Sequence, residues 1–272
     1  MLLLFQEPLQ LVWVLVVGLV AGVLGGLLGV GGSIVMIPGL TFVLGYDQHL
    51  YQAAAMVANV AVSVPATLQH RKAGAIVPAA LRWMIPIALL MILLGVWASN
   101  RQLVAGEDGG KWLGRILALF CVYVIYVNLR KLRSCPFPDS GVQAILTPFR
   151  CSFVGASMGF AAGLLGIGGG ALAVPLQQFV LRLPLRNCIA NSSAIICVSA
   201  GLGAAYKCGS LATHSHHWSE GFVMGLVLVP TAWAGGRFGG SLAHILPLRQ
   251  LRVAFVLFML AAAWKMAAIP FF

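Results

Sequence analysis

The sequence predicts an all-α integral membrane protein made of two inverted repeats, each a short broken-helix hairpin followed by three transmembrane helices. Three observations carry this prediction: the apolar composition, a glycine-rich element that occurs twice, and the uneven placement of lysine and arginine. Of the 272 residues, 60% are hydrophobic and only 8% are charged. An average soluble domain is about 25% charged, so the chain is expected to lie in a lipid bilayer.

Apolar stretches near the length of about 20 residues that a helix needs to cross a bilayer recur along the chain, which allows roughly eight spans. They cover residues 9–30, 52–69, 76–98, 113–129, 153–167, 188–205, 222–236 and 253–268. No room remains for a sizeable soluble domain. The opening MLLLFQEPLQ has neither a basic start nor a small-residue cleavage site, so we do not expect a removable signal peptide.

The repeat is visible in two glycine-rich segments, GLLGVGGSIVMIP at 26–38 and GLLGIGGGALAVP at 163–175. They lie 137 positions apart, so that Gly29 matches Gly166 and Pro38 matches Pro175. Further glycines upstream keep the same register. We therefore divide the chain into a first transmembrane repeat (1–133), a linker (134–150) and a second transmembrane repeat (151–272).

The distribution of lysine and arginine predicts the orientation of each repeat relative to the two sides of the membrane. The net charge of +11 comes from lysines and arginines at the ends of spans, and not from one patch. Positive-inside bias explains this pattern without a nucleic-acid partner, and it places the basic linker in the cytoplasm. A hairpin followed by three crossings then turns the second repeat over and leaves both termini outside the cytoplasm, in a multi-pass inner-membrane protein. A parallel duplication stays possible if the short segments do not form hairpins.

The glycines fall into two groups with different expected roles. Gly18, Gly22 and Gly26, like their counterparts Gly155, Gly159 and Gly163, have the small-xxx-small spacing of closely packed helices. The denser GVGGS and GIGGG clusters weaken a helix, so each predicts a break with a new short helix beginning near Ser33 and Gly170. The alternative is a pair of kinks that serve packing alone. Neither cluster has the lysine of a phosphate-binding P-loop.

Two such breaks brought together near the membrane midplane predict an oxyanion site, because helix N-termini present unpaired N–H groups and partial positive charge. Asparagines and serines of the following spans could add donors, or they could simply bond neighbouring helices. The candidate substrate-binding residues are Gly29, Gly31, Gly32, Ser33, Asn59, Gly166, Gly168, Gly169, Gly170, Asn191, Ser192 and Ser193.

These elements resemble the sulfite exporter TauE/SafE family of anion permeases. The resemblance covers essentially the whole chain and is carried by segments 29–38 and 166–175, with QHRKAG at 69–74 and YKCGSL at 206–211. It implies movement of sulfite, organosulfonates or related small anions, mostly outward. Family members often carry a Thr-Ser pair where this chain has Met56 and Val57, which favours a site weighted toward the second repeat.

The charges favour export over accumulation. All six carboxylates lie outside or at the edges of the apolar spans, whereas proton relays usually place them inside. An anion that leaves an inside-negative cell gains about 2.3 kcal/mol per charge per 100 mV. We therefore expect alternating-access export driven at least partly by membrane potential, with no enzyme activity, no cofactor and a possible homodimer. Arg71, Lys72 and Lys207 either draw anions to the mouths of the pathway or serve only as topology signals.

Two rival functions stay open. THSHHW at 213–218 holds three histidines, the commonest transition-metal ligand, so a membrane metal-handling protein is one alternative. An exposed loop without a cysteine or carboxylate partner set is the simpler interpretation of this segment, and no bound metal is expected. The other alternative is a coupled uptake permease for a sulfur-containing or carboxylate anion.

Overall fold

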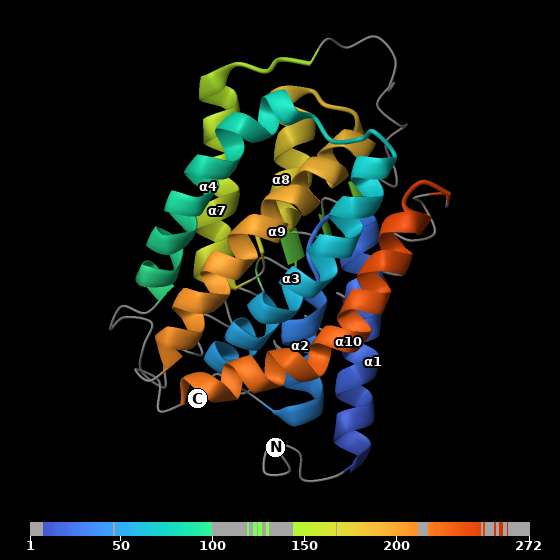
Figure 1. Ribbon diagram of the computed structural model, residues 1–272, viewed down its shortest axis with the longest axis vertical. Coiled ribbons are helices and arrows are strands. Elements are labelled where there is room, and N and C mark those ends of the chain that lie inside the picture. The colour runs from blue at the N-terminus through green and yellow to red at the C-terminus, as the bar shows by residue number, and fades with distance from the viewer. Residues whose placement is uncertain are drawn as a thin grey trace.

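Figure 1 shows the computed structural model of the chain. It describes residues 8–45, 47–99, 144–166, 168–211, 217–245 and 247, with scattered positions between 119 and 130 and between 253 and 260. Every regular element in this part of the chain is a helix, which confirms the all-α prediction.

The same order of elements occurs in both halves. The first half contains α1 (Pro8–Leu28), α2 (Ser33–Leu44), α3 (Gln48–Lys72) and α4 (Pro78–Ser99). The second half contains α7 (Pro148–Leu165), α8 (Gly170–Leu176), a π-helical turn η1 (Gln177–Leu181), α9 (Leu185–Gly209) and α10 (Trp218–Leu242). In each half a long helix, a short helix and two long helices follow one another. The inversion of the second half relative to the first stays a prediction.

Five of the described helices are long and apolar enough to cross a membrane: α1, α3, α4, α9 and α10. Each coincides with a predicted span. The predicted span at 153–167 falls on α7, which has 18 residues and is not among these five. The predicted spans at 113–129 and 253–268 lie largely outside the described residues, as does most of the predicted linker.

Helices α3 and α9 form the centre of the bundle. Their apolar segments are 83% and 67% buried, against 39% for α4 and 44% for α10. They pack against each other, α1 and α10 pack together beside α3, and α4 and α7 pack together beside α9 (Figure 1). The first helix of each half thus contacts the last described long helix of the other half. Residues on α3 and α9 are therefore the ones best placed to line a site between the halves.

The spaced glycines allow the outer helix pairs to approach closely, as predicted. A Cβ at Gly22 of α1 would lie 2.5 Å from the carbonyl oxygen of Ala232 on α10. A Cβ at Gly155 of α7 would lie 2.5 Å from the carbonyl oxygen of Met84 on α4. Both neighbours are backbone atoms that cannot rotate away, so only glycine permits these contacts.

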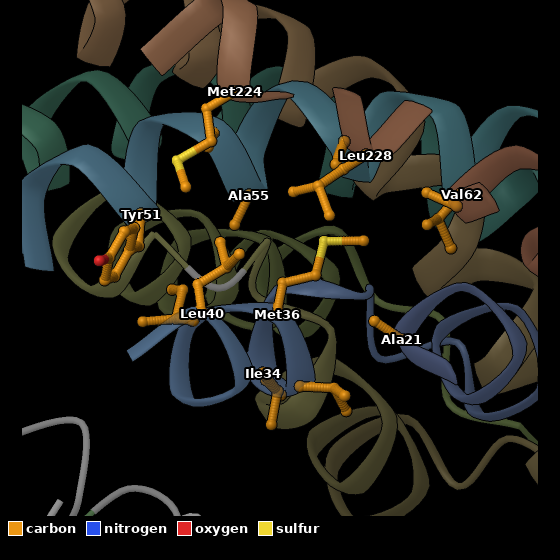
Figure 2. Close-up of a cluster of buried hydrophobic side chains, with 14 of the residues drawn as sticks. Ala21, Ile34, Met36, Leu40, Tyr51, Ala55, Val62, Met224 and Leu228 are labelled. Atoms are coloured by element: carbon orange, nitrogen blue, oxygen red, sulfur yellow. The ribbon is translucent and has the colours of Figure 1, made fainter. Parts of the chain in front are cut away.

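The short helix α2 is enclosed by the bundle, and all its side chains from Ser33 to Thr41 are buried. Figure 2 shows Met36 and Leu40 of α2 facing Ala55 of α3 and Leu228 of α10. This apolar packing holds the start of α2, and with it the first glycine cluster, against the central helices.

Candidate functional site

The two glycine clusters break the chain where the sequence predicts it. Between α1 and α2, Gly29 and Gly31 have φ values of 61° and 80°. Between α7 and α8, Gly166, Gly168 and Gly169 have φ values of 69°, 72° and 72°. Residues that carry a side chain rarely adopt this left-handed backbone conformation, so these positions favour glycine. The next helices begin at Ser33 and Gly170, as predicted. We call residues 29–32 the first break and residues 166–169 the second break.

The two breaks lie against each other. A Cβ at Gly170 would lie 2.5 Å from the carbonyl carbon and oxygen of Val30 and 2.6 Å from the carbonyl oxygen of Gly29. This contact joins residues that are about half the chain apart. The structure therefore brings together the two halves of the predicted site.

Asn59 of α3 reaches both breaks. Its Oδ1 accepts a hydrogen bond from the Ser33 backbone N–H at 3.1 Å, and its Nδ2 donates to the Ser33 hydroxyl. A Cβ at Gly168 would lie 2.6 Å from the same Nδ2. Asn59 is fully buried. Its carboxamide thus satisfies the first N–H of α2 while its amino group faces the second break.

The polar residues at the start of α9 separate into two roles. Ser192 donates its hydroxyl to the Gly29 carbonyl at 2.5 Å, so it contacts the first break from the second half. Asn191 bonds elsewhere: its Oδ1 accepts from the Val77 N–H at 2.8 Å, and its Nδ2 donates to Gln177 Oε1 at 3.2 Å. Asn191 therefore braces the start of α4 against η1, which is the helix-bonding alternative for this residue. Ser193 is buried beside them.

A stripe of buried polar side chains on α3 extends beyond the predicted residues. Gln48, Gln52, Asn59 and Ser63 are each 2% exposed or less. Their spacings of four, seven and four residues place them on one face of the helix. Sequence reasoning selected Asn59 for the site but missed the two glutamines, although the spacing itself was readable.

Lys207 corrects one expectation. We expected it at a solvent-facing mouth, but it is 1% exposed at the end of α9. Its Nζ donates to Ser99 Oγ at 2.8 Å and lies 3.5 Å from Nδ1 of His49. Arg71 and Lys72, in contrast, are exposed at the end of α3, as a position at a mouth requires.

A histidine pair lies near the first break and was missed by the sequence reasoning. His70 is fully buried, with Nε2 3.3 Å from the Gly26 carbonyl oxygen and Nδ1 3.2 Å from Nε2 of His244. A carbonyl only accepts, so Nε2 of His70 carries the proton and Nδ1 accepts from His244. The pair joins the end of α3 to the residues after α10 and to the last turn of α1. Burial, assisted by the charge of Arg186, lowers the pKa of His244.

This pKa shift predicts a pH-dependent stability. Because the pKa of His244 is lower in the folded chain than its ordinary value of about 6.5, the unfolded chain binds the proton first as pH falls. The contribution of His244 to the free energy of unfolding therefore has its full value above about pH 6.5 and decreases as the pH falls below that value. We expect the melting temperature in detergent to drop on acidification, with a shallower slope in His244→Gln and in Arg186→Gln. Slopes equal to that of the unsubstituted chain would contradict this assignment.

The histidine-rich segment at 213–218 lies mostly outside the described residues. His217, its described histidine, is exposed and caps α10: its N–H donates to Glu220 Oε1 at 3.4 Å, and its Nδ1 accepts from the Ser219 N–H at 3.4 Å. Within the residues that the structure describes, no three histidine, cysteine or acidic side chains are grouped to hold a metal ion. His214 and His216 are not among them, so the metal-handling alternative stays open.

Comparison with known proteins agrees with the resemblance. A family model described as sulfite exporter TauE/SafE matches residues 14–266. The probable membrane transporter protein MamO of Paramagnetospirillum magneticum is 27% identical over 94% of this chain, which covers 44% of that protein. MamO of Magnetospirillum gryphiswaldense is 28% identical over 91% of this chain and is 43% covered. The chain therefore spans less than half the length of these two relatives.

A shorter relative matches along most of both chains. The probable membrane transporter protein YunE of Bacillus subtilis is 25% identical over 86% of this chain and 89% of its own length. No solved structure matches the chain.

Proposed function

This chain belongs to the sulfite exporter TauE/SafE family, and from that premise we propose that it is a membrane transporter that exports a small sulfur-containing oxyanion by alternating access. The contact between the two breaks is the observation that carries the proposal. A site built where the two halves meet can open to either side of the membrane when the halves move against each other.

The polar groups at the breaks suit an oxyanion such as sulfite or an organosulfonate. The Asn59 amino group donates one N–H to the Ser33 hydroxyl and keeps a second N–H for a ligand. Ser192 gives its one O–H to the Gly29 carbonyl, so this hydroxyl holds the first break and is not a donor to the anion. The glycines carry no side chains of their own, so the peptide groups of the two breaks approach each other and the Asn59 carboxamide closely. Asn191 is left out of this proposed site, because both hydrogen-bond partners of its carboxamide, Val77 and Gln177, lie outside the breaks.

The proposed driving force is the membrane potential, which favours the exit of an anion from an inside-negative cell by about 2.3 kcal/mol per charge per 100 mV. The described acids support uncoupled movement: Asp47 caps the start of α3, and Glu220 lies in the first turn of α10, so neither lies within a span. Export down this gradient needs no coupling ion.

Coupled uptake of a sulfur-containing or carboxylate anion is a second candidate, and one observation favours it. The His70–His244 pair places two titratable rings at one end of the bundle, close to the last turn of α1. The buried His70 and the partly exposed His244 could carry a proton where intramembrane carboxylates are missing from the described spans.

Flux measured in proteoliposomes distinguishes these functions. We expect labelled sulfite or methanesulfonate to move toward the positive side of an imposed potassium–valinomycin potential, with no requirement for a pH gradient. A tenfold change in the potassium ratio corresponds to roughly 60 mV, or about 1.4 kcal/mol for a monovalent anion, and should shift the final anion ratio about tenfold. Flux that follows a pH gradient and ignores voltage would support coupled uptake and contradict voltage-driven export.

A further inference from the structure

A buried ammonium group lies where three helices end. Lys207, near the last residue of α9, contacts Ser99 at the end of α4 and His49 in the first turn of α3. Lys207 is 1% exposed, His49 is 7% exposed and Ser99 is fully buried. A charge removed from water is costly unless oppositely charged or strongly polar groups surround it. Burying the Lys207 ammonium therefore costs more free energy than burying an apolar side chain at the same position.

Two neighbouring carboxamides have no hydrogen-bond partner among the residues that the structure describes. Gln48 and Gln52 are 2% and 0% exposed, and neither the oxygen nor the nitrogen of either side chain is bonded. Nearly all buried polar groups in native proteins are bonded, so unbonded ones call for a ligand, an ion or a water molecule. Each carboxamide offers two N–H donors. Four N–H donors are thus available for an acceptor that the described part of the chain does not supply.

Helix geometry places Gln52 between Gln48 and His49 around α3, about 40° from Gln48 and about 60° from His49. His49 of this group meets Lys207. Gln52 also lies against the second break, because a Cβ at Gly166 would be 2.6 Å from both Cβ and Cγ of Gln52. The group therefore connects the Lys207 end of the bundle with the meeting point of the breaks.

We propose that Lys207, Gln48 and Gln52, with Ser99 and His49 beside them, form a second oxyanion site on the path to the breaks. This inference rests on the proposed function, since it assigns the site to the transported anion. Its ligand class is a small anion with a terminal –SO₃ group, whose three oxygens can accept bonds from an ammonium and two carboxamides at once. The ammonium supplies charge attraction, and the amides supply direction.

Calorimetric titration of the purified full chain in detergent with sodium sulfite and with sodium methanesulfonate tests the site. We expect Lys207→Gln to weaken binding of both anions at least about tenfold, because it removes a buried charge from the ligand's contact shell. Lys207→Arg, which keeps the charge, should retain most of the affinity. Arg237→Gln is the control: Arg237 is an exposed cation on α10 beside Trp233, and its loss should leave binding unchanged. Equal affinities in Lys207→Gln and Arg237→Gln would overturn the proposal.

A double substitution of the glutamines separates binding from folding, and it keeps the test valid if Lys207→Gln does not fold. Gln48→Leu with Gln52→Leu removes amides that have no hydrogen bond within the described residues, so the melting temperature without anion should stay equal or rise. Anion affinity should fall, and KM for flux should rise. A stabilised variant with unchanged affinity and flux would mean that the amides are tolerated defects, and the site would be wrong.

The same measurements separate this site from the proposed function. If the unsubstituted chain binds methanesulfonate in a Lys207-dependent way but moves neither anion across liposomes, export fails and the site stands. If the chain transports both anions and neither Lys207→Gln nor the glutamine double variant changes KM, export stands and this second site fails.

Discussion

Replacing Gly170 with alanine is expected to abolish measurable anion flux and to lower the free energy of unfolding by about 1–3 kcal/mol, the usual cost of overpacking. The added Cβ would lie 2.5 Å from the carbonyl carbon and oxygen of Val30. These are backbone atoms of the first break, so relief requires the two breaks to move apart. Because the proposed anion site lies where the breaks meet, even a folded variant should bind its substrate poorly.

Gly201→Ala is the matched control for this substitution. Gly201 lies inside α9, and a Cβ there would meet nothing within 4 Å. An alanine in a helix interior is more stable than a glycine by about 0.5–1 kcal/mol, so this variant should melt at the same temperature or slightly higher and should keep its flux. Thermal melting in detergent and flux in proteoliposomes measure both effects. If Gly170→Ala transports as well as Gly201→Ala, the contact between the breaks is not part of the site.

The sequence was sufficient to predict the helix breaks because their cause is local. Several glycines within five residues weaken any helix, whatever packs around it. The resulting starts of α2 and α8, at Ser33 and Gly170, agree with the prediction. The close packing of the spaced glycines was predictable for a similar reason, since their four-residue spacing already places them on one helix face.

The partners of individual side chains could not be predicted in this way. Asn191 and Ser192 are adjacent in sequence and were equally good candidates, yet Ser192 bonds Gly29 while Asn191 bonds Val77 and Gln177. Consecutive helical residues point about 100° apart. Two of these partners, Gly29 and Val77, are more than 100 residues away in sequence from the side chains that they meet.

Lys207 shows the same limit for charge. A lysine near the end of an apolar span can extend to the membrane surface or turn into the protein. Its contacts with Ser99 and His49 depend on how α9 packs against α3 and α4, which neither composition nor periodicity specifies. The spacing was sufficient to predict the stripe of Gln48, Gln52, Asn59 and Ser63. Its role in a site depends on the two breaks that lie beside it, and the spacing does not give their position.

Asn59→Asp is expected to lower sulfite flux at least about tenfold, mainly through KM, because it places an acceptor with negative charge where an anion is proposed to bind. The substitution keeps an oxygen able to accept from the Ser33 N–H, so the first turn of α2 should persist. Asn59→Leu removes that acceptor as well. Leaving the buried N–H unbonded should cost about 1–3 kcal/mol, so this second variant should melt at a lower temperature than the aspartate variant.

Asn191→Asp is the matched comparison, since both asparagines are fully buried and both were candidates from the sequence. At Asn191 the substitution keeps the acceptor for the Val77 N–H and loses the donor to Gln177, so we expect lower thermal stability with KM unchanged. An equal rise in KM at both positions would extend the anion site to Asn191 and the start of α4. No rise at either position would move the site away from the breaks altogether, because Asn59 is the side chain that touches both of them. The difference between the two KM values therefore locates the anion within the contact of the two halves.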